Sequence, residues 1–398
     1  MDRRTFLAGA VAAGFQARPA LSQSGRPSTG YLRTNWSLDP LTLGSYSFIA
    51  KGARKRHTSD LAEPVNQRLF FAGEATHPDY NSTVHAAIES GQFAAEAIAK
   101  TDARTVAIIG AGMAGLSAGQ ALHRDGRIVT VIEARDRIGG RIWTDTSLGA
   151  PLDLGASWIH GDVDNPLMDL ARQIGAQTRP TSDSYVIRGA DGRALRDSEA
   201  PAWLDEVVTT QHSAGAALAD INTRAYWIDL DYDGDDMLLP RGYAPFVNAL
   251  ARDLDIRLDQ QVAKITQTTS GVAIDGAPFD AVVVTVPLGA LKAGAIRFDP
   301  PLPAQKQTAI DRLQMGVLDK LYLRYPAVFW DADKTWIITA ETGLPPGQFN
   351  QWLNLHPYLG EPILVAFNGA DPARDLSSLS DADIVARAET VLAQAYPG

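Results

Sequence analysis

The sequence has no cysteine among its 398 residues. Disulfide bonds, thiolate chemistry and a cofactor attached through cysteine are therefore excluded. Histidine is scarce as well, with seven residues, and these show neither an H-E-x-x-H motif nor a paired metal-ligand spacing. We therefore predict no metal site.

Positive charge is also in short supply, because 36 basic residues face 46 acidic ones and the net charge is −10. This balance argues against nucleic acid as a partner and mildly favours cationic ligands. The hydrophobic share of 45% and the charged share of 21% are typical of a soluble protein. The length is sufficient for two domains with full cores.

The amino terminus, residues 1–22, has the features of an export signal. Arg3-Arg4-Thr5-Phe6-Leu7 is a twin-arginine pattern, and the apolar run from Thr5 to Phe15 is too short to span a bilayer. Ala20-Leu21-Ser22 offers small residues for cleavage. We expect export of the folded protein to a bacterial periplasm, with no membrane anchor remaining after cleavage. Residues 23–30 are expected to form a linker after the signal. An ordinary secretory signal is the alternative.

The strongest motif begins with the short apolar run from Val106 to Ile109, which is typical of a buried parallel strand. Three glycines in G-x-G-x-x-G spacing follow, then a helical pattern to about Arg124, and then a second strand from Arg127 to Ile132 that ends in an acid. The motif residues are Gly110, Ala111, Gly112, Met113, Ala114, Gly115 and Glu133. Strand, glycine turn, helix, strand and acid together predict a dinucleotide site.

Each motif residue has a physical task. Gly110 permits the tight turn, Gly112 lets a pyrophosphate approach the backbone, and Gly115 lets the helix pack close to the strand. The positive end of that helix favours the phosphates. Glu133 lies 23 residues after Gly110, which suits a hydrogen bond to the adenosine ribose and argues against a 2′-phosphate.

The residues after this motif resemble the flavin-dependent amine oxidase family. Glu133-Ala134-Arg135, Ile138-Gly139-Gly140-Arg141 and Asp153-Leu154-Gly155-Ala156-Ser157-Trp158-Ile159-His160-Gly161 carry the resemblance, and the W-I-H-G wording is closest to polyamine oxidases. The resemblance implies non-covalent FAD. The further residues expected to contact it are Arg135, Gly140, Arg141, Gly155, Ala156, Ser157, Trp158, Val262, Gly73, Glu74, Thr83 and Val84.

The order of the segments departs from the family pattern. Tyr31 to Lys100, with Leu69 to Thr76 and the helix opening at Ser82, resembles the carboxy-terminal end of an amine oxidase rather than its start. The stretch from Leu364 to Gly398 resembles the part that usually precedes Tyr31. We therefore expect a circularly permuted chain, which is tolerated when the cut lies in an exposed connection. A misassembled gene is the alternative.

The implied fold is α/β, with a Rossmann-like FAD-binding domain and an α+β substrate domain that has a mixed sheet, their segments interleaved along the chain. We assign 58–160 and 240–290 to the FAD domain, with 31–57 bordering the flavin, and 161–239 and 291–398 to the substrate domain. Within these ranges we expect helices over Asn165 to Ile174, over Pro201 to Ile221 and from Pro240, and strands over Ile256 to Ile265, Ala281 to Val286 and Leu321 to Tyr325.

The resemblance implies a reaction in which a hydride passes from the carbon beside an amine nitrogen to flavin N5. The product imine hydrolyses to an aldehyde, and dioxygen reoxidises the flavin to give hydrogen peroxide. We expect Lys320 to hold a water at N5, Tyr46 to form one wall of an aromatic cage, and His160 to contact the substrate. Alternatively, Lys320 is a surface lysine, Tyr46 belongs to the core, and His160 is a satisfied boundary histidine.

A polyamine is the expected substrate. An oxidase of L-amino acids or of other small amines is an alternative, and it would need a cavity arginine for the substrate carboxylate. A non-catalytic flavoprotein, or an inactive product of gene rearrangement, is another.

Two further motif matches are rejected. Ser117 fits a hydrolase elbow but lies inside the dinucleotide helix. Asp229, Asp231, Asp233 and Gly234 mimic the start of a calcium loop whose twelfth position is Pro240 instead of a glutamate.

Overall fold

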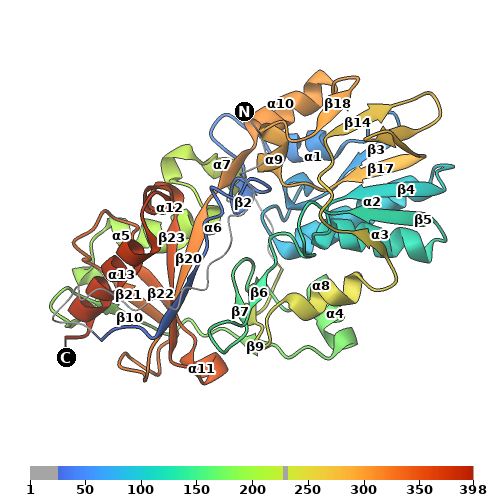
Figure 1. Cartoon of the computed structure of the whole chain (residues 1–398). Coiled ribbons are helices and arrows are strands. Elements are labelled where there is room, and N and C mark those ends of the chain that lie inside the picture. Colours follow the sequence, from blue (N-terminus) through green and yellow to red (C-terminus); the bar gives the residue numbers. More distant parts are fainter. Residues whose placement is uncertain (1–25, 227–231, 398) are drawn as a thin grey trace, which may run out of the picture.

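The computed structural model describes residues 26–226 and 232–397, arranged around two large sheets that lie side by side (Figure 1). One is a five-stranded sheet and the other a seven-stranded sheet. The expected export signal, Asp229 and Asp231 lie outside the described residues. No helix in the described ranges has the length and apolar character needed to cross a bilayer.

The five-stranded sheet is parallel throughout, in the order β13-β5-β4-β17-β3. Its strands are β3 (Leu69–Phe71), β4 (Thr105–Ile109), β5 (Ile128–Ile132), β13 (Asp255–Arg257) and β17 (Ala281–Val284). All four residues of β17 are buried, as expected for a parallel strand covered on both faces. The predicted strands at 106–109, 127–132 and 281–286 are thus present, each within two residues of its expected ends.

Helices α2 (Val84–Ala99) and α3 (Met113–Arg124) pack on one face of this sheet. The loop over 100–104 joins α2 directly to β4. Gly91 makes the close approach of the two helices possible, because a Cβ atom there would lie 2.2 Å from the carbonyl oxygen of Ala114. The opposite face is covered by α1 (Arg56–Ala62), α10 (Ala304–Arg312) and a small sheet in the order β16-β15-β14-β18.

The expectation of strand over Ile256 to Ile265 is only partly correct. The segment divides into β13, which joins the parallel sheet, and β14 (Lys264–Gln267), which joins the small sheet. Residues 258–263 between them are not strand. Asp259, with φ +56°, turns the chain there, so one continuous strand is not possible. The other strands of the small sheet are β15 (Val272–Ile274), β16 (Ala277–Phe279) and β18 (Arg297–Asp299).

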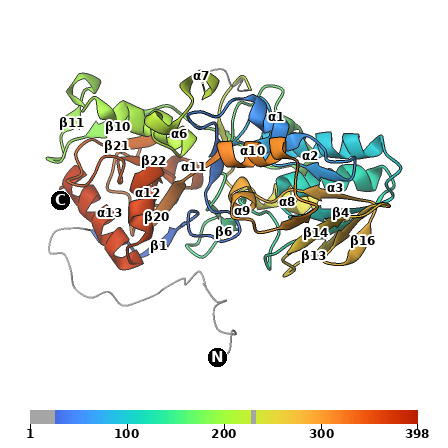
Figure 2. The ribbon, with the colours of Figure 1, turned by 90° about the horizontal axis from the view of Figure 1, so that it is seen from above.

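The seven-stranded sheet is mixed, in the order β1-β20-β23-β22-β21-β10-β11. All its pairs are antiparallel except β10 with β21. Its strands are β1 (Gly30–Arg33), β10 (Tyr185–Arg188), β11 (Ala194–Leu195), β20 (Leu318–Arg324), β21 (Trp336–Thr339), β22 (Gln351–Asn354) and β23 (Ile363–Gly369). Helices α12 (Ala370–Ser377) and α13 (Asp381–Ala395) lie beside it (Figure 2).

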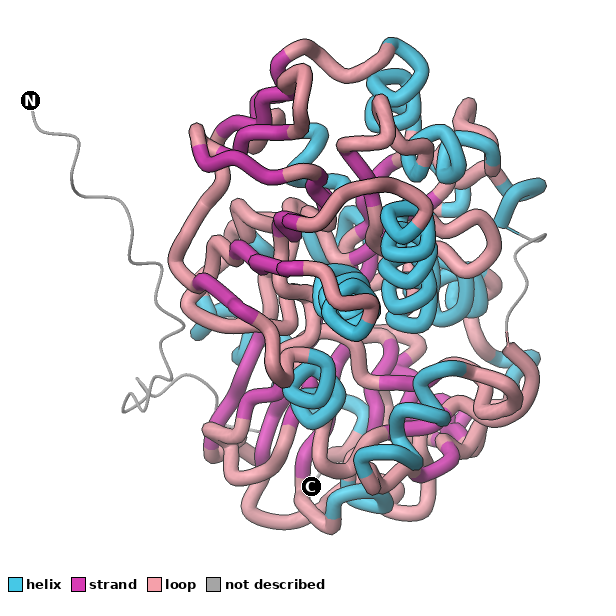
Figure 3. The backbone as a smooth tube through the Cα atoms, turned by 90° about the vertical axis from the view of Figure 1, so that its right-hand side faces the viewer, coloured by secondary structure: helices cyan, strands magenta, loops and turns pink. Residues whose placement is uncertain are grey.

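Short elements and loops connect the two sheets. Figure 3 distinguishes loops from helices and strands along the described chain. The short strands are β2 (Tyr46–Phe48), which pairs with β19 (Gln314–Gly316), together with β6 (Thr144–Asp145), β7 (Leu152–Asp153), β8 (Trp158–Ile159), β9 (Arg179–Pro180) and β12 (Met237–Leu238). The remaining α-helices are α4 (Pro166–Ile174), α5 (Trp203–Glu206), α6 (His212–Ala214), α7 (Thr223–Tyr226), α8 (Ala244–Leu250), α9 (Leu288–Lys292) and α11 (His356–Leu359).

The helix predicted over Asn165 to Ile174 is present as α4, and Asn165 caps it by accepting the N–H of Leu167. The region from Pro201 to Ile221 is broken further than expected. It contains α5, the π-helical turn η3 (Val207–Gln211), α6 and the 3-10 turn η4 (Leu218–Asp220). Gly215, at φ +62°, ends α6 after one turn.

Candidate active site

A cavity of about 1170 Å³ is lined by residues of both large sheets and of the loops between them. It begins at the glycine turn after β4 and includes side chains of β20, β21, β22 and β23. Of the predicted site residues, those in its wall are Tyr46, Gly73, Glu74, Thr83, Val84, Gly110, Gly112, Met113, Ala114, Glu133, Arg135, Gly140, Arg141, Gly155, Ala156, Ser157, Trp158, His160, Val262 and Lys320.

Ala111 and Gly115 do not line this wall. Ala111 donates its backbone N–H to Glu133 Oε2 at 2.7 Å. Gly115 packs against the turn, where an added Cβ would lie 2.0 Å from the carbonyl oxygen of Gly110. Both residues shape the turn from behind. Close helix packing was the role expected of Gly115.

The glycine turn leaves the amino end of α3 open to the cavity. Gly110 has φ +109°, and Gly112 is the N-cap residue of α3 without a side chain to block the first N–H groups. A Cβ on Gly112 would have only the carbonyl oxygen of Gly139 near it, at 3.9 Å, so its missing side chain leaves space rather than relieving a clash. A phosphate group is suited to such a helix end.

Glu133 lies at the end of β5, beside this turn. Its Oε1 accepts the N–H of Arg135 at 2.8 Å, in addition to the bond from Ala111. Each carboxylate oxygen has further lone-pair capacity, so ribose hydroxyls can still bind on the cavity side. The guanidinium of Arg135 is held by Asp39 at 2.8 Å.

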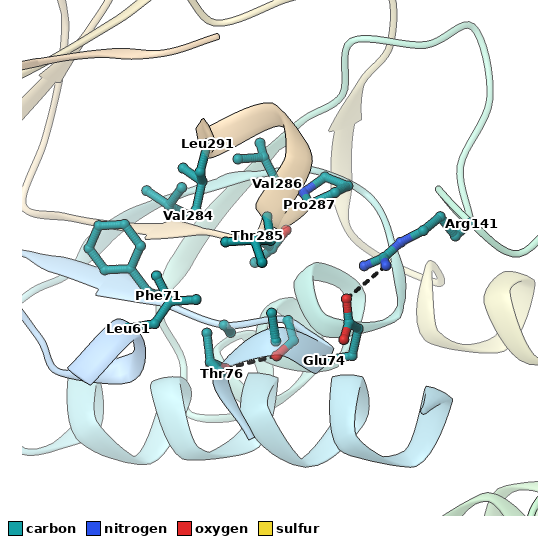
Figure 4. Close-up of a pocket in the computed structure, with 14 residues that line it drawn as sticks. Leu61, Phe71, Glu74, Thr76, Arg141, Val284, Thr285, Val286, Pro287 and Leu291 are labelled. Atoms are coloured by element: carbon teal, nitrogen blue, oxygen red, sulfur yellow. Dashed lines mark hydrogen bonds and ion pairs between the residues drawn. The ribbon is translucent and has the colours of Figure 1, made fainter. Parts of the chain in front are cut away.

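Glu74 and Arg141 form an ion pair in the same wall, and Figure 4 shows the two side chains pointing toward each other. A smaller hollow of about 10 Å³ lies behind them, bordered by β3, the end of β17 and the Pro287 turn. That volume holds about one water molecule. The adjoining large cavity is therefore the place for a ligand.

Lys320 is 5% exposed and lies on β20, between β1 and β23, so it is not a surface lysine. Its Nζ donates to the carbonyl oxygens of Asp153 at 2.9 Å and Gly155 at 2.5 Å, and to the hydroxyl of Ser157 at 2.5 Å. Burial lowers the pKa of the Lys320 ammonium, while the charge of Asp153 opposes that shift. Loss of the proton would free a nitrogen lone pair beside the cavity.

Tyr46 is half-buried and its hydroxyl donates to the backbone carbonyl of His212. The ring therefore has a fixed place in the wall rather than in the core. The side chain of His160 is 50% exposed and pairs with Asp236 at 3.1 Å. This partner agrees with a satisfied boundary histidine, although both residues line the cavity.

Sequence reasoning missed the aromatic lining around Lys320. Trp336 stacks on Trp158 with centroids 6.0 Å apart, and Phe367 contacts both rings. Phe367 is also the register partner of Lys320 across β20 and β23. His212 and Gln351 complete this part of the wall. No local motif marks these positions; only the pairing of distant strands reveals them.

The described part of the cavity wall carries aspartates, whereas its arginines are already paired with carboxylates. Of the described lining residues, the arginines are Arg135 and Arg141, and each is paired with a carboxylate. Asp183, Asp235 and Asp236 line the end near His160. Within the described ranges no group of three or more His, Asp or Glu side chains is placed to hold a metal ion.

The parallel sheet, the open glycine turn with its acid, and a cavity extending from that turn to a buried lysine define a dinucleotide-dependent enzyme. Residues 16–99, 113–201 and 204–398 match the model of the flavin containing amine oxidoreductases, and the chain belongs to that family. Its cofactor is FAD and its reaction is the oxidation of an amine.

Curated relatives include polyamine oxidase 2 of Arabidopsis thaliana, which is 32% identical over 354 residues, covering 73% of this chain and 72% of the relative. Polyamine oxidase 5 of Oryza sativa subsp. japonica is 33% identical over 359 residues, covering 74% and 72%.

Similar solved structures include a redesigned putrescine oxidase triple mutant, with a TM-score of 0.58 and 22% identity over 74% of this chain and 81% of the other. Cyclohexylamine oxidase from Brevibacterium oxydans IH-35A has a TM-score of 0.57 and 22% identity, over 74% of this chain and 82% of the other. At this identity the likeness shows the fold.

Proposed function

We propose that the amine is a polyamine, oxidised at a carbon beside one of its nitrogens. The observation that supports this proposal is the charge of the cavity wall. Asp183, Asp235 and Asp236 line it, and both arginines of the described lining are already paired with carboxylates. Carboxylates and aromatic faces both attract a chain that carries several positive charges. The named polyamine oxidase relatives point to the same substrate class.

An L-amino acid is a weaker candidate. Its carboxylate would need a cationic partner in the cavity, and Arg135 and Arg141 are committed to Asp39 and Glu74. The lysine in the wall, Lys320, donates to three protein acceptors. Burying a carboxylate without a partner is costly, so the wall selects against it.

The residues of the chain would divide the work as follows. The open end of α3, Gly112 and Glu133 would hold the phosphates and a ribose of FAD, which supplies the acceptor for the hydride removed from carbon and is restored by dioxygen. Asp235 and Asp236 would attract the cationic amine at the outer end. Tyr46, Trp336 and Phe367 would keep water from the reacting carbon.

An amine must be neutral before it gives up hydride, and an alkylammonium has a pKa of about 10.4 in water. Transfer into the apolar wall near Trp158 and Phe367 disfavours the charged form. Lys320 lies 5.8 Å and 6.0 Å from the centroids of these two rings. We propose that its nitrogen positions a water there in the neutral form, which burial favours, by accepting a hydrogen bond from the water through the free lone pair.

We further propose that the chain is circularly permuted relative to its family and is exported by the twin-arginine route to a periplasm. The short loop over 100–104 between α2 and β4 supports the permuted order. The extent of the matches with the polyamine oxidases also supports it, because these matches cover 70–74% of this chain. The part from Thr105 onward makes up about three quarters of its 398 residues.

The division into domains follows from the same proposal, with FAD-binding segments at 58–160 and 240–290 and substrate segments at 161–239 and 291–398. Converting Arg3 and Arg4 to lysine tests the export route. Loss of the protein from a periplasmic fraction, with intact cytoplasmic enzyme, is the expected result. Unchanged export would favour an ordinary secretory signal.

One experiment tests the function. The chain from Arg26 onward is expressed, and its visible spectrum is recorded before and after anaerobic addition of spermine, spermidine or putrescine. We expect a bound flavin that bleaches with a polyamine and not with an L-amino acid. A flavin that only an amino acid bleaches would overturn the substrate assignment. A colourless protein would contradict FAD binding and therefore also the proposed oxidase activity.

A further inference from the structure

The carboxylate of Asp153 is buried among neutral hydrogen-bond donors. The residue is 7% exposed and lies at the end of β7, opposite Thr144 of β6. Its Oδ1 accepts the hydroxyl of Thr144 at 2.5 Å and the backbone N–H of Tyr243 at 3.0 Å. These donors carry no charge, in contrast to Arg141, which pairs with Glu74. Burying a carboxylate is costly unless an opposite charge lies near it, so the cation closest to Asp153 matters.

Lys320 supplies this cation, and the backbone limits the distance between the two charges. Its Nζ donates to the main-chain carbonyl oxygen of Asp153 at 2.9 Å. Four covalent bonds join that oxygen to the carboxyl carbon of the same residue, so the two charges lie within about 8 Å of each other. The charge of Lys320 lowers the pKa of Asp153 against the effect of burial, and the charge of Asp153 raises the pKa of Lys320.

Three further titratable side chains near the pair stay neutral around pH 7. Tyr322 donates its hydroxyl to the carbonyl oxygen of Asp153 at 2.6 Å. Burial raises the pKa of Tyr322 and of Tyr243 well above the usual value. His212 packs against Phe367 with ring centroids 6.5 Å apart, and burial lowers its pKa to about 4. None of these three groups therefore replaces the charge of the carboxylate.

The charged groups closest to Lys320 along β20 and β1 lie on the other face of the sheet. Asp319 precedes Lys320, and side chains alternate along a strand, so its carboxylate points away from the lysine. Arg33 is the register partner of Leu321 and shares that opposite face. Its guanidinium pairs with Asp381 at 2.5 Å. Asp153 is therefore the charge that acts on Lys320 from its own side.

We propose that Asp153 is a positioning residue for amine oxidation, because its buried carboxylate is the counter-charge of Lys320 and sets the pH at which that lysine becomes neutral. The inference rests on the proposed function, in which neutral Lys320 positions a water, and adds the group that controls this state. Without the carboxylate, burial would act on the lysine unopposed and the neutral form would arise at lower pH. At an effective dielectric constant of about 20, charges about 8 Å apart change each other's pKa by about one unit or more.

The first test is a pH profile of anaerobic flavin reduction by spermidine. Asp153→Asn removes the charge and keeps an oxygen that can accept from Thr144 and Tyr243. We expect the midpoint of the profile to fall by about one unit, with the rate above the midpoint changed less than about threefold. Adding Asp153→Asn to Lys320→Met should change nothing further, because the carboxylate acts through the lysine.

The matched control is Asp319→Asn. This carboxylate is also buried and also has two neutral donors, the hydroxyl of Thr34 at 2.8 Å and the N–H of Trp36 at 2.9 Å. Because it lies on the opposite face of β20, its removal should move the midpoint less than half as far as Asp153→Asn does. Equal midpoints in wild type and Asp153→Asn would overturn the inference.

The second test needs no variant of Asp153 and no turnover. The holoenzyme is labelled with ¹³C at the aspartate carboxyl and lysine Cε positions, and NMR spectra are recorded as the pH rises. The Cε resonance that is missing from Lys320→Met belongs to Lys320. We expect one ionised aspartate carboxyl to shift together with this resonance, and that shift should be absent in Lys320→Met. A carboxyl that does not respond, or that is protonated at the lysine midpoint, would contradict the proposed pair.

The outcomes separate the two proposals. If polyamines bleach the wild-type flavin but neither the kinetic midpoint in Asp153→Asn nor an aspartate carboxyl resonance responds, the role of Asp153 is wrong and the proposed function stands. If no polyamine bleaches the flavin, the proposed function fails, and the NMR titration still decides whether Asp153 and Lys320 act on each other.

Discussion

Arg141 and Glu74 form an ion pair of 2.8 Å across 67 positions of the chain. Glu74 is 4% exposed and also accepts the hydroxyl of Ser47 at 2.6 Å and the N–H of Ser82 at 3.0 Å. One carboxylate therefore joins β2, the turn before α2 and the loop after β5. Residues of all three segments line the FAD cavity.

Glu74→Gln should weaken both the fold and FAD binding. The glutamine would turn an NH₂ group toward Arg141, Ser47 or Ser82, which now donate to the carboxylate. Breaking the buried ion pair with Arg141 costs about 3–5 kcal/mol. Differential scanning calorimetry should show Tm lowered by several degrees, and FAD content should fall. The control is Asp371→Asn, which breaks the exposed pair with Arg374 and should change little. Equal Tm values for the two variants would contradict the role of Glu74.

The two glycines of the turn should respond differently to alanine. In Gly115→Ala the new Cβ would lie 2.0 Å from a backbone oxygen, so the apoprotein should be strongly destabilised. In Gly112→Ala the nearest atom is 3.9 Å away, so the apoprotein should fold with an unchanged Tm. The added methyl group would instead stand where the phosphates approach, and FAD affinity, measured by fluorescence titration, should fall. Normal FAD affinity in Gly112→Ala would show that the pyrophosphate binds elsewhere.

Lys320→Met tests the chemical role of the buried lysine. The side chain keeps its volume but loses the nitrogen beside the cavity, and we expect anaerobic flavin reduction to slow by about 10²-fold or more while FAD remains bound. Lys292→Met is the matched control. Its Nζ donates to the carbonyls of Ile310, Asp311 and Leu313, each at 2.9 Å, but it does not line the cavity.

A stopped-flow trace of each variant with spermidine decides the result. Similar rates in Lys320→Met and Lys292→Met would mean that the lysine only supports the fold. The pH profile gives a second readout. Because burial lowers the pKa of Lys320, the wild type should show a titration of the reduction rate below the normal lysine range, and Lys320→Met should lack it.

Acid should destabilise the protein through its buried histidines. Burial lowers the pKa of both His85 and His212 from 6.5 to about 4. The unfolded chain thus binds more protons than the folded one between these values, so stability is complete above pH 6.5 and declines as the pH falls toward 4. At pH 5 the loss is about 2 kcal/mol for each histidine.

Chemical denaturation of wild type and His85→Gln at pH 7.5 and pH 5 measures this effect. The difference in unfolding free energy between the two pH values should be smaller in the variant by about 2 kcal/mol. An equal difference in both proteins would mean that His85 is protonated in the folded state.

The sequence predicted the βαβ unit well because its signals are local. Glycine spacing, the apolar run before Gly110 and the acid at Glu133 all lie within about 30 residues, and the strand and helix bounds follow from them. The cavity wall was harder to predict. Lys320 meets Phe367 only through the register of β20 and β23, and His212 lines the wall directly after a π-helical turn that the sequence did not predict.

The segment between Arg257 and Lys264 shows the same limit. The sequence predicts one strand through it, yet the chain turns at Asp259 and divides between two sheets. Which sheet each half joins depends on partners far along the chain, and composition alone does not specify them. The locations of Ala111 and Gly115 behind the turn likewise require the three-dimensional packing.

The direct passage from α2 into β4 has a consequence for synthesis of the protein. Helix α2, strand β4, helix α3 and strand β5 occupy one uninterrupted stretch from Val84 to Ile132, and the two helices pack on each other while the two strands pair. Contacts of short sequence separation form quickly. This half of the cofactor site can therefore assemble on the ribosome while β17, its remaining neighbour at Ala281–Val284, is still to be translated.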